Sequence, residues 1–572
     1  MVNIVDPRQN ELFDMFKEFL SPLGYKTLIS GWQGVFRHVI LEVLPASEIA
    51  NHFNPTFGRP TKELYSIAGL LLIKEFMDWT EEEAANAYMF NVDIQYALNL
   101  GRDNISMSVR TLQRYEQLFR DDEFSSQVMT DVTGKLISEL DLDISKQRLD
   151  STHIMSDMAT FARTRLMGIT IRRFLVQLKR YGREHYDSLP EELRVRYEVS
   201  QGALFGSVPS EKRSPLRQEV AEQMYFLITR FSGITDIESR TTYKNLVTVF
   251  NQQCDLIEPK KPVEKHVGGN GGDDQTDDGK NTPILPPKNT DKKTVPDDKT
   301  KNLEAPSNTS DSSDLNKSKD EDTRVAVKKK TGGRVIQNPS DPDATYDGKK
   351  GAGYQVQFSE TCSDNNDVQI ITYACPETAC ESDCNAVFPA LDKLEKDQRL
   401  PDEMLGDTLY GSDANVLESE KRGVNLISPV SGKPPKEPPE DPTPKQERLA
   451  ARREEEQTEE WRAAYALRAG LEGTNSGIKR KTGLGRLRVR GQKSVFNAIF
   501  LKTAGWNILR ASKSKKMKAI MAKIVEKPSA HGNSFINLRV FRCLTRFQRP
   551  LVMRFRPTVP LGTTIPENRL AA

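Results

Sequence analysis

Apolar residues recur at intervals of three and four through most of residues 47–140, and this spacing predicts several short helices. The pattern is strongest in ELYSIAGLLLIKEFMDW, where Pro60 and Thr61 just upstream predict the start of the helix. Thr80 and Glu83 then match a capping box at the start of a second helix. Residues 1–140 are therefore predicted to form an all-α N-terminal domain.

The last helix of this series is predicted within VRTLQRYEQLFRDD, with Ser108 as its N-cap. Its polar face would expose Arg110, Gln113 and Arg114. Short helices joined by tight turns permit a helix-turn-helix-like DNA reader, but helical bundles that do not bind DNA have the same pattern. Both interpretations stay open at this stage.

The pattern changes at QRLDSTHI, where a short strand carrying Asp150 is predicted in place of a helix. Helical spacing returns in ITIRRFLVQLKRYGREHY and VAEQMYFLITRF, which hold enough Leu, Ile and Phe for a modest core of their own. The strand is assigned to residues 141–160 and a helical insertion to residues 161–255.

Residues 256–340 are rich in Asp, Lys, Thr, Ser, Pro and Gly, and no aromatic residue occurs between Phe250 and Tyr346. Such a segment has little apolar area to offset the entropy lost on ordering. It is predicted to be a disordered linker that acts as a tether without chemistry of its own.

Strand patterns resume after the linker. Alternation in GAGYQVQFSETC and the apolar run VQIITYAC predict a hairpin, NAVFPALDKLEK predicts a helix, and VNLISPV predicts a further strand. Between the last two lies EMLGDTLYGSDANV, a short apolar approach to an acid. Residues 341–525 are assigned to the rest of an α/β domain, and residues 526–572 to a basic C-terminal tail.

The net charge of the chain hides a strong local excess of bases. Over 572 residues, 82 Lys and Arg nearly balance 80 Asp and Glu, yet from Lys479 to Arg556 there are 21 bases and one acid, Glu526. A polyanion such as DNA is the natural partner of this end of the chain.

Cysteine content and hydropathy limit the cellular setting. Six cysteines are few for this length, and the chain begins without a charged-then-apolar leader, so a reducing cytoplasm is expected. The longest strongly apolar run, IAGLLLI, is too short to cross a bilayer, so no membrane partner is expected.

Tyr465, Arg468, Glu472 and Lys479 share one short stretch, YALRAGLEGTNSGIK. On a continuous helix, at about 100° per residue, they would fall within about 60° of one face. An aromatic ring, two cations and a carboxylate on one stripe suit a site for phosphate and metal. Such residues also form ordinary solvated helix faces with salt bridges.

The spacing Tyr-x2-Arg-x3-Glu-x6-Lys resembles the YREK signature of bacterial insertion-sequence DDE transposases. The pieces FNPTFGRPTKELYSIAGLLLIKEF, RLDSTHI, and KKGAGYQVQFSETC through GDTLYGSDANV are similar to the same family. The resemblance implies an α/β fold: a ribonuclease-H-like mixed-sheet catalytic domain, interrupted by the helical insertion and the linker and preceded by the all-α domain. It also implies an enzyme that binds terminal inverted repeats, cleaves DNA at their ends with metal-activated water, and joins the 3′-hydroxyls to target DNA.

The resemblance makes Asp150, Asp407 and Glu472 the catalytic acids and the metal ligands. Two Mg²⁺ ions, for which Mn²⁺ can substitute, need hard anionic oxygen ligands of this type. Asp141 and Asp143 are alternatives to Asp150.

The second acid has its own alternative and a departure from the family pattern. Asp413 lies six residues after Asp407 and competes with it. The family commonly shows Asp-x-Gly/Ala-Tyr/Phe at this point, and the match here runs from Asp407 to Tyr410 with Leu409 in place of the small residue.

Tyr465, Arg468 and Lys479 are implied to hold the phosphates and nucleotides at the cleaved transposon end. The bases that follow are expected to track the DNA backbone without reading its sequence: Arg480, Lys481, Arg486, Arg488 and Arg490. Pairing two transposon ends implies at least a homodimer in the active complex, and no small-molecule substrate is expected.

Two other functions compete with this hypothesis. A decayed transposase that only binds DNA is one, because Leu409 departs from the family and low-complexity sequence interrupts the domain. A metal-dependent nuclease that cuts without joining is the other.

The cysteines and a histidine near the first acid were also weighed for function. Cys375, Cys380 and Cys384, with Cys362, contain no Cys-x2-Cys knuckle, so free thiols are favoured over zinc. His153 is expected to be a structural hydrogen-bonding residue.

Overall fold

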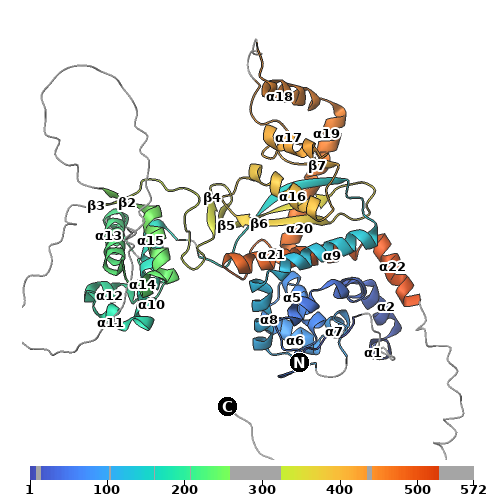
Figure 1. Ribbon diagram of the computed structural model, residues 1–572, viewed down its shortest axis with the longest axis horizontal. Helices are drawn as coiled ribbons and strands as arrows, with labels where there is room; N and C mark the ends of the chain where they lie inside the picture. Colours follow the sequence, from blue (N-terminus) through green and yellow to red (C-terminus); the bar gives the residue numbers. More distant parts are fainter. Residues whose placement is uncertain are drawn as a thin grey trace, which may run out of the picture. The chain divides into compact units, whose positions relative to one another are not determined.

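The computed structural model describes residues 1–7, 15–101, 105–159, 161–206, 208–257, 324–434 and 441–526 (Figure 1). The chain divides into two compact units, Met1–Met521 and Ala522–Ala572. Most of the predicted linker, and the predicted tail beyond Glu526, lie outside the described residues. No helix of the described ranges is long and apolar enough to cross a membrane.

Every secondary-structure element that the structure describes up to residue 140 is helical. Thr80 and Glu83 form the predicted capping box of α6, and Ser108 caps α8 by accepting the Thr111 amide. Both caps confirm the sequence prediction. The elements are α1 (Met15–Phe19), α2 (Pro22–Ser30), α3 (Trp32–Val35), a π-helical turn (Phe36–Ile40), a 3-10 turn (Leu41–Val43), α4 (Ala46–Ala50), α5 (Leu64–Phe76), α6 (Glu81–Phe90), α7 (Val92–Ala97), α8 (Val109–Asp121) and α9 (Phe124–Leu140).

Helix α5 begins at Leu64, so the predicted start at Pro60 and Thr61 is wrong. Its N-cap is Glu63. The Glu63 carboxylate accepts hydrogen bonds from the backbone amides of Tyr65 and Ser66, at 3.0 and 2.6 Å. Thr61 instead pairs with the extended N-terminal segment, because its hydroxyl accepts the Asn3 amide at 2.9 Å. A carboxylate caps a helix as well as a hydroxyl does.

A mixed sheet forms the centre of the second half of the chain (Figure 1). Its strands are β1 (Lys146–Ile154), β4 (Thr345–Asp347), β5 (Gly351–Thr361), β6 (Ile371–Thr378), β7 (Glu403–Leu405) and β8 (Asn425–Ile427). β6, β5 and β1 are neighbours in antiparallel pairs, whereas β1, β7 and β8 are neighbours in parallel pairs. The predicted strand at residues 147–154 and the predicted hairpin are confirmed, and the order is compatible with a ribonuclease-H-like sheet.

The two faces of β1 meet different helices because successive side chains alternate between the faces of a strand. Leu149 packs in a core with Val387 and Leu391 of α16 (Val387–Lys396). Arg148, on the other face, reaches the carbonyl of Leu467 at 2.7 Å. That face therefore carries the turn η5 (Leu467–Ala469) and helix α20 (Gly470–Thr482), which contain the YREK residues.

The remaining elements surround this sheet or belong to the insertion. Helix α21 (Gln492–Ala511) packs against α5 and α9, and it is followed by α22 (Lys515–Glu526). The elements between α16 and η5 are β7, α17 (Asp413–Lys421), β8, α18 (Pro444–Glu455) and α19 (Glu459–Ala466). A short 3-10 turn, η4 (Asp383–Asn385), precedes α16.

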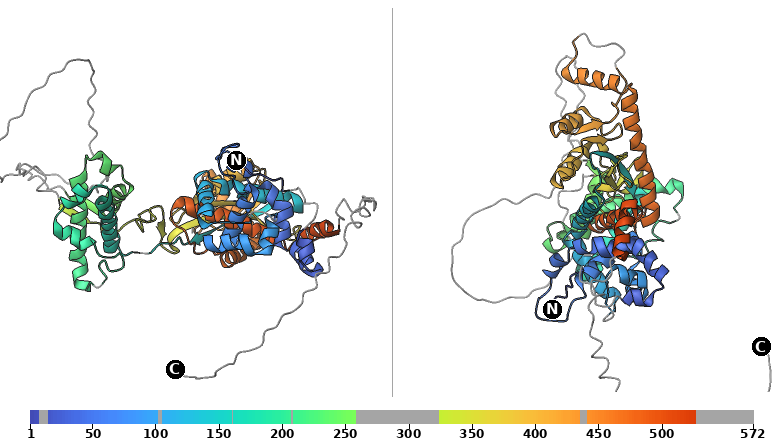
Figure 2. Two further views of the ribbon diagram at one scale, coloured as in Figure 1. Left: turned by 90° about the horizontal axis from the view of Figure 1, so that it is seen from below. Right: turned by 90° about the vertical axis from the view of Figure 1, so that its right-hand side faces the viewer.

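The insertion has a hydrophobic core of its own, as its sequence predicts. Leu175, Met224 and Leu246 are buried in this core, one from each of its three longest helices. These three helices lie together in both sets of views (Figure 1, Figure 2). The elements are α10 (Arg163–Tyr181), α11 (Arg183–Asp187), α12 (Glu191–Tyr197), η3 (Ser210–Lys212), α13 (Arg213–Phe231), α14 (Thr235–Glu238), α15 (Thr241–Gln253), and the antiparallel pair β2 (Cys254–Ile257) and β3 (Arg324–Val327).

Candidate active site

Asp150, within β1, and Asp407, just after β7, occupy matching positions beyond the paired part of these neighbouring parallel strands. The last paired residues of β1 and β7 are Arg148 and Leu405, and each acid comes two residues later. Adjacent strands lie about 4.8 Å apart, so chains that continue in register keep such residues close together. The electrostatic repulsion between the two carboxylates, which helps to raise the pKa of Asp150, agrees with this closeness.

The Asp150 carboxylate is enclosed on the helix-covered face of β1. Its side chain is 16 % exposed, and burial raises its pKa to about 6, with Arg468 opposing the shift. The amide nitrogen of Asn475 donates to one carboxylate oxygen at 3.2 Å, and Arg468 lies 3.7 Å from the other. A carboxylate that is mostly buried and accepts few hydrogen bonds would be stabilised in its charged form by a bound cation.

Two of the rivals to these acids, Asp143 and Asp413, have structural partners. Asp143 accepts hydrogen bonds from Ser145 and Ser363, which hold the pKa of its carboxyl well below the usual range. Asp413 forms a two-point contact with Arg448 of α18, at 3.1 and 2.7 Å, and this contact lowers its pKa. The environments favour Asp150 and Asp407 as the acids with free carboxylate oxygens.

The turn after β7 accommodates the unusual Leu409. Asp407 accepts the Leu409 amide at 2.8 Å, and the Leu409 side chain is 53 % exposed. Tyr410 turns inward instead, where its hydroxyl donates to Gln357 at 2.7 Å. The larger residue at position 409 therefore points to solvent and does not displace the acid.

The YREK stretch is not one continuous helix, so the prediction of a single stripe is wrong. Helix α19 ends at Ala466, η5 intervenes, and α20 begins at Gly470. The reason is steric, because a Cβ at Gly470 would lie 1.9 Å from the Arg148 guanidinium. The glycine lets the chain pass over the buried arginine, and the tighter 3-10 turn rotates the residues before it.

Arg468 connects the first and third candidate acids. It lies 3.7 Å from Asp150 and 3.5 Å from Glu472. The Glu472 side chain is 68 % exposed and turned toward this guanidinium. Among the described residues no group of three or more His, Cys, Asp or Glu is arranged to hold a metal ion. The charge of Asp407 acts on Asp150, whereas Arg468 lies between Asp150 and Glu472.

Tyr465 belongs to an aromatic pair beside the site. Its ring stacks on Trp461 with centroids 4.9 Å apart and an interplanar angle of 18°. Both rings pack against a small cluster of Cys362, Leu405 and Ile427 at the end of the sheet. The sequence signature points to Tyr465 but gives no sign of Trp461, whose role depends on the preceding turn of α19.

The predicted DNA-binding bases lie on and after α20. Arg480, Lys481, Arg486, Arg488 and Arg490 are all exposed. The segment after α20 runs beside the end of β1, where Met155 exchanges backbone hydrogen bonds with Gly485 and Leu487 at 3.1 and 2.8 Å. The backbone therefore fixes this basic segment beside the end of β1.

A buried lysine attaches the end of α20 to the N-terminal helices. Lys502 of α21 is 2 % exposed and donates to the carbonyls of Glu75 and Thr482 and to the carboxylate of Asp78, at 2.7, 2.6 and 3.0 Å. Asp78 also pairs with Arg488 at 3.3 Å. Sequence reasoning missed Lys502, because nothing in the spacing distinguishes it from a solvated lysine.

Replacing Lys502 with Met should destabilise the protein by about 2–4 kcal/mol, because two buried carbonyls and a carboxylate lose their donor. Urea unfolding, followed by the fluorescence of the buried Trp506, measures the loss. Lys513→Met is the matched control, since this exposed lysine follows the same helix, and it should change stability by under about 0.5 kcal/mol. Equal effects of the two substitutions would show that Lys502 is not a structural anchor.

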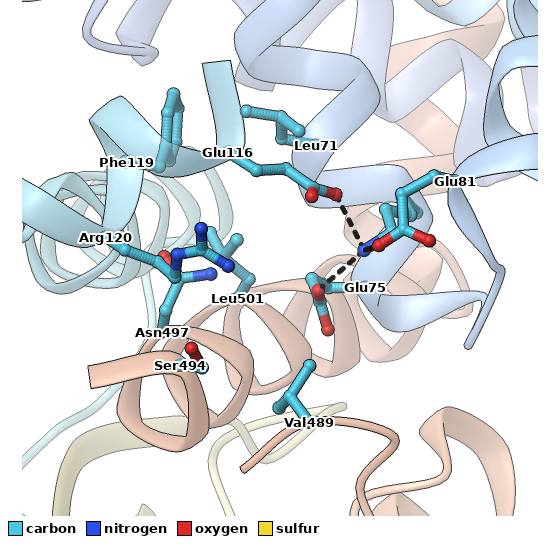
Figure 3. Close-up of a pocket in the computed structure, with 11 residues that line it drawn as sticks. Leu71, Glu75, Glu81, Glu116, Phe119, Arg120, Val489, Ser494, Asn497 and Leu501 are labelled. Atoms are coloured by element: carbon cyan, nitrogen blue, oxygen red, sulfur yellow. Dashed lines mark hydrogen bonds and ion pairs between the residues drawn. The ribbon is translucent and has the colours of Figure 1, made fainter. Parts of the chain in front are cut away.

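A pocket between the N-terminal helices and α21 is filled with paired charge (Figure 3). Lys74 lies 2.8 Å from Glu116, 3.4 Å from Glu75 and 3.7 Å from Glu81. Burial opposes the charge on Lys74, but the three acids together raise its pKa. The acids of this pocket are neutralised by a lysine, so its chemistry is that of an internal ion-pair network.

The cysteines and His153 lie outside the proposed set of acids. Cys362, Cys375, Cys380 and Cys384 form no disulfide among the described residues. The two ring nitrogens of His153 are buried and make no hydrogen bond of good geometry, although the backbone of Ala352 acts on the ring. Burial, followed by the charge of Lys479, lowers the pKa of the ring, which is neutral at pH 7.

Comparison with known families agrees with this geometry over part of the chain. Residues 441–511 match the family model described as "Transposase DDE domain". The matched segment runs from just before α18 to the end of α21, so it includes Glu472 but neither Asp150 nor Asp407. No match to a curated protein or to a solved structure was found. The match supports a DDE transposase, a class of enzyme that acts on DNA and generally uses divalent metals.

The donor atoms at the site suit a hard divalent cation. Asp150 and Asp407 supply carboxylate oxygens, and the amide oxygen of Asn475 beside Asp150 is buried without a partner. Oxygen ligands of this kind are the ones that Mg²⁺ prefers. The fit is incomplete at Glu472, because Arg468 occupies its carboxylate.

The raised pKa of Asp150 predicts how the metal-free protein responds to pH. Because the folded state holds the proton more tightly, stability falls as the pH rises from about 4 to about 6. Asp150→Asn should therefore increase the free energy of unfolding by about 2–3 kcal/mol at pH 7 and change it little at pH 4. Urea unfolding of both proteins at the two pH values tests this. A difference that does not depend on pH would contradict it.

Proposed function

We propose that this chain is the transposase of a bacterial insertion sequence. It binds the terminal inverted repeats of its element, cleaves the phosphodiester at their ends with water, and joins the freed 3′-hydroxyls to target DNA. The observation that carries the proposal is that Asp150 in β1, with Asp407 just after the neighbouring parallel strand β7, faces a helix that matches a transposase DDE domain and bears Glu472.

Asp150, Asp407 and Glu472 would hold two Mg²⁺ ions, for which Mn²⁺ can substitute. When bound, such ions activate the attacking oxygen and stabilise the leaving oxygen of a phosphodiester. Glu472 reaches this arrangement once Arg468 releases it. A DNA phosphate is a natural alternative partner for that guanidinium, because arginine binds phosphate with two parallel donors.

The other residues of the proposed site act on the DNA. Arg468 and Lys479 bind phosphates at the cleaved end, and Tyr465, stacked on Trp461, contacts the neighbouring nucleotide. Arg480, Lys481, Arg486, Arg488 and Arg490 follow the backbone on the exposed surface beside β1. The active complex pairs two transposon ends and is at least a homodimer.

Incubation with a duplex that carries the terminal repeat of the element tests the proposal. With Mg²⁺ the protein should nick the end of the repeat, and with a pre-cut end it should join that end to a second duplex. Nicking without joining would favour a nuclease. Binding without nicking would favour a decayed transposase that serves as a DNA-binding protein.

A further inference from the structure

A lysine at the tip of the β4–β5 hairpin lies over the strand that carries the first candidate acid. The ammonium of Lys350 donates to the Ser151 hydroxyl at 3.0 Å and approaches the Gln355 side chain at 3.5 Å. Ser151 directly follows Asp150, so Lys350 stands on the opposite face of β1 from Arg468. The YREK signature does not include this hairpin, although the wider family resemblance extends to its segment KKGAGYQVQFSETC.

The hairpin turn holds Lys350 in this position. Asp347 accepts the amides of Lys349 and Lys350 at 2.8 and 2.6 Å, and Gly351 has a φ of +99°, which favours glycine. Both lysines are exposed, but the Lys350 side chain hydrogen-bonds to β1, whereas among the described residues the Lys349 side chain has no hydrogen bond or ion pair. Lys349 is therefore a control with the same charge and nearly the same position as Lys350, but without its hydrogen bond to Ser151.

Lys479 reaches the same end of β1 from α20. Its side chain packs on Gly485, which a backbone hydrogen bond ties to Met155 just past the strand. Burial, followed by the charge of Lys350, lowers the pKa of Lys479, so the two ammonium groups repel each other. Between them lies His153, whose neutral ring makes no hydrogen bond of good geometry.

The local charge is only partly balanced. Lys350 is 3.9 Å from Asp383, at the outer limit of an ion pair, and among the described residues Lys479 has no ion pair. Asp347, in the same turn, is another acid close to Lys350, so the two cations are only partly neutralised and an anion bound between them would stabilise them. The surface beside the candidate acids is therefore suited to a phosphate.

We infer that Lys350 and Lys479 form a second phosphate site near the end of β1, beyond Asp150, which binds a DNA backbone phosphate. The inference rests on the proposed function, and it adds Lys350 to the residues that hold the substrate. Arg468 and this second site would bind the backbone at two points along β1, fixing the strand across the acids.

The salt dependence of DNA binding tests the role of Lys350. Affinity for a duplex carrying the terminal repeat is measured without divalent metal, for the wild type, Lys350→Ala, Lys350→Arg and the control Lys349→Ala. Loss of one phosphate contact should make the slope of log affinity against log salt shallower by about 0.9 for Lys350→Ala. Lys350→Arg and Lys349→Ala should keep the wild-type slope.

A second measurement places the contact on the DNA. Single phosphates of the duplex are replaced one at a time by neutral methylphosphonates. At one position the replacement should lower the DNA affinity of the wild type but cause no further loss of affinity in Lys350→Ala. The inference is overturned if Lys350→Ala keeps the wild-type slope, or if Lys349→Ala loses as much. If one of these two results is found but the wild type still cleaves the DNA, only the inference about Lys350 fails and the proposed function is unaffected. A wild type that does not bind the duplex overturns both.

Discussion

Asp407→Asn should abolish Mg²⁺-dependent cleavage of transposon-end DNA, with a loss on the order of a thousandfold or more. The substitution keeps the shape of the side chain and the Asx turn to the Leu409 amide. It removes the negative charge that, with Asp150 on the next strand, would hold the cations. Cleavage of end-labelled duplex measures the effect, and DNA affinity without metal should stay near that of the wild type.

Asp413→Asn is the matched control for this prediction. Asp413 is the acid that competes with Asp407 in the sequence, but its carboxylate is bound by Arg448 at two points. The variant should lose a little stability and keep its cleavage rate to within about threefold. If Asp413→Asn is the inactive variant and Asp407→Asn cleaves normally, the assignment of the second acid is wrong.

Arg148→Met should reduce the free energy of unfolding by about 3–5 kcal/mol, the largest stability change that we expect. Arg148 donates to Glu360 from two nitrogens, at 2.8 and 2.5 Å, and Glu360 is completely buried beneath α20. Removal of the arginine leaves a buried carboxylate with Thr474 and the more distant Arg510. Urea unfolding followed by Trp506 fluorescence measures the change.

The double variant Arg148→Met, Glu360→Leu separates this cause from a loss of packing. When both charges are removed, no buried charge is left unpaired, and most of the lost stability should return. If the double variant is as unstable as Arg148→Met with an intact Glu360, the effect comes from packing around the arginine and not from the ion pair.

Local sequence signals predicted the sheet and the caps well. Asp150 was placed on a strand because QRLDSTHI interrupts a helical pattern, and β1 occupies that segment. Thr80 and Ser108 were recognised because a capping hydroxyl acts within three residues of its own position. Glu63 was missed as the cap of α5, because Pro60 and Thr61 offered a competing local signal whose outcome depends on the N-terminal segment.

Features that depend on contacts between distant segments could not be predicted. The break before Gly470 results from Arg148, which is more than 300 positions away in the sequence. The anchoring role of Lys502 requires Asp78 and Thr482 to meet it, and the position of Lys350 requires the hairpin to fold over β1. In each case the residue type is common, and only its surroundings give it a role.

The candidate site was partly predictable for the same reason. The resemblance directed attention to Asp150 and Asp407, and each lies two residues beyond the last pair of the parallel strands β1 and β7. It gave no indication that Arg468 would occupy the Glu472 carboxylate. A side-chain pairing of this kind depends on the absence or presence of bound phosphate, which sequence spacing does not express.

The most direct test of the central claim is nicking of a duplex in which the terminal repeat joins its flanking DNA. The wild type with Mg²⁺ should nick the strand at that junction, whereas EDTA, Asp150→Asn and Glu472→Gln should each prevent the nick without preventing binding. A wild type that binds the repeat but never nicks it, or a Glu472→Gln variant that nicks as fast as the wild type, would contradict the proposed enzyme.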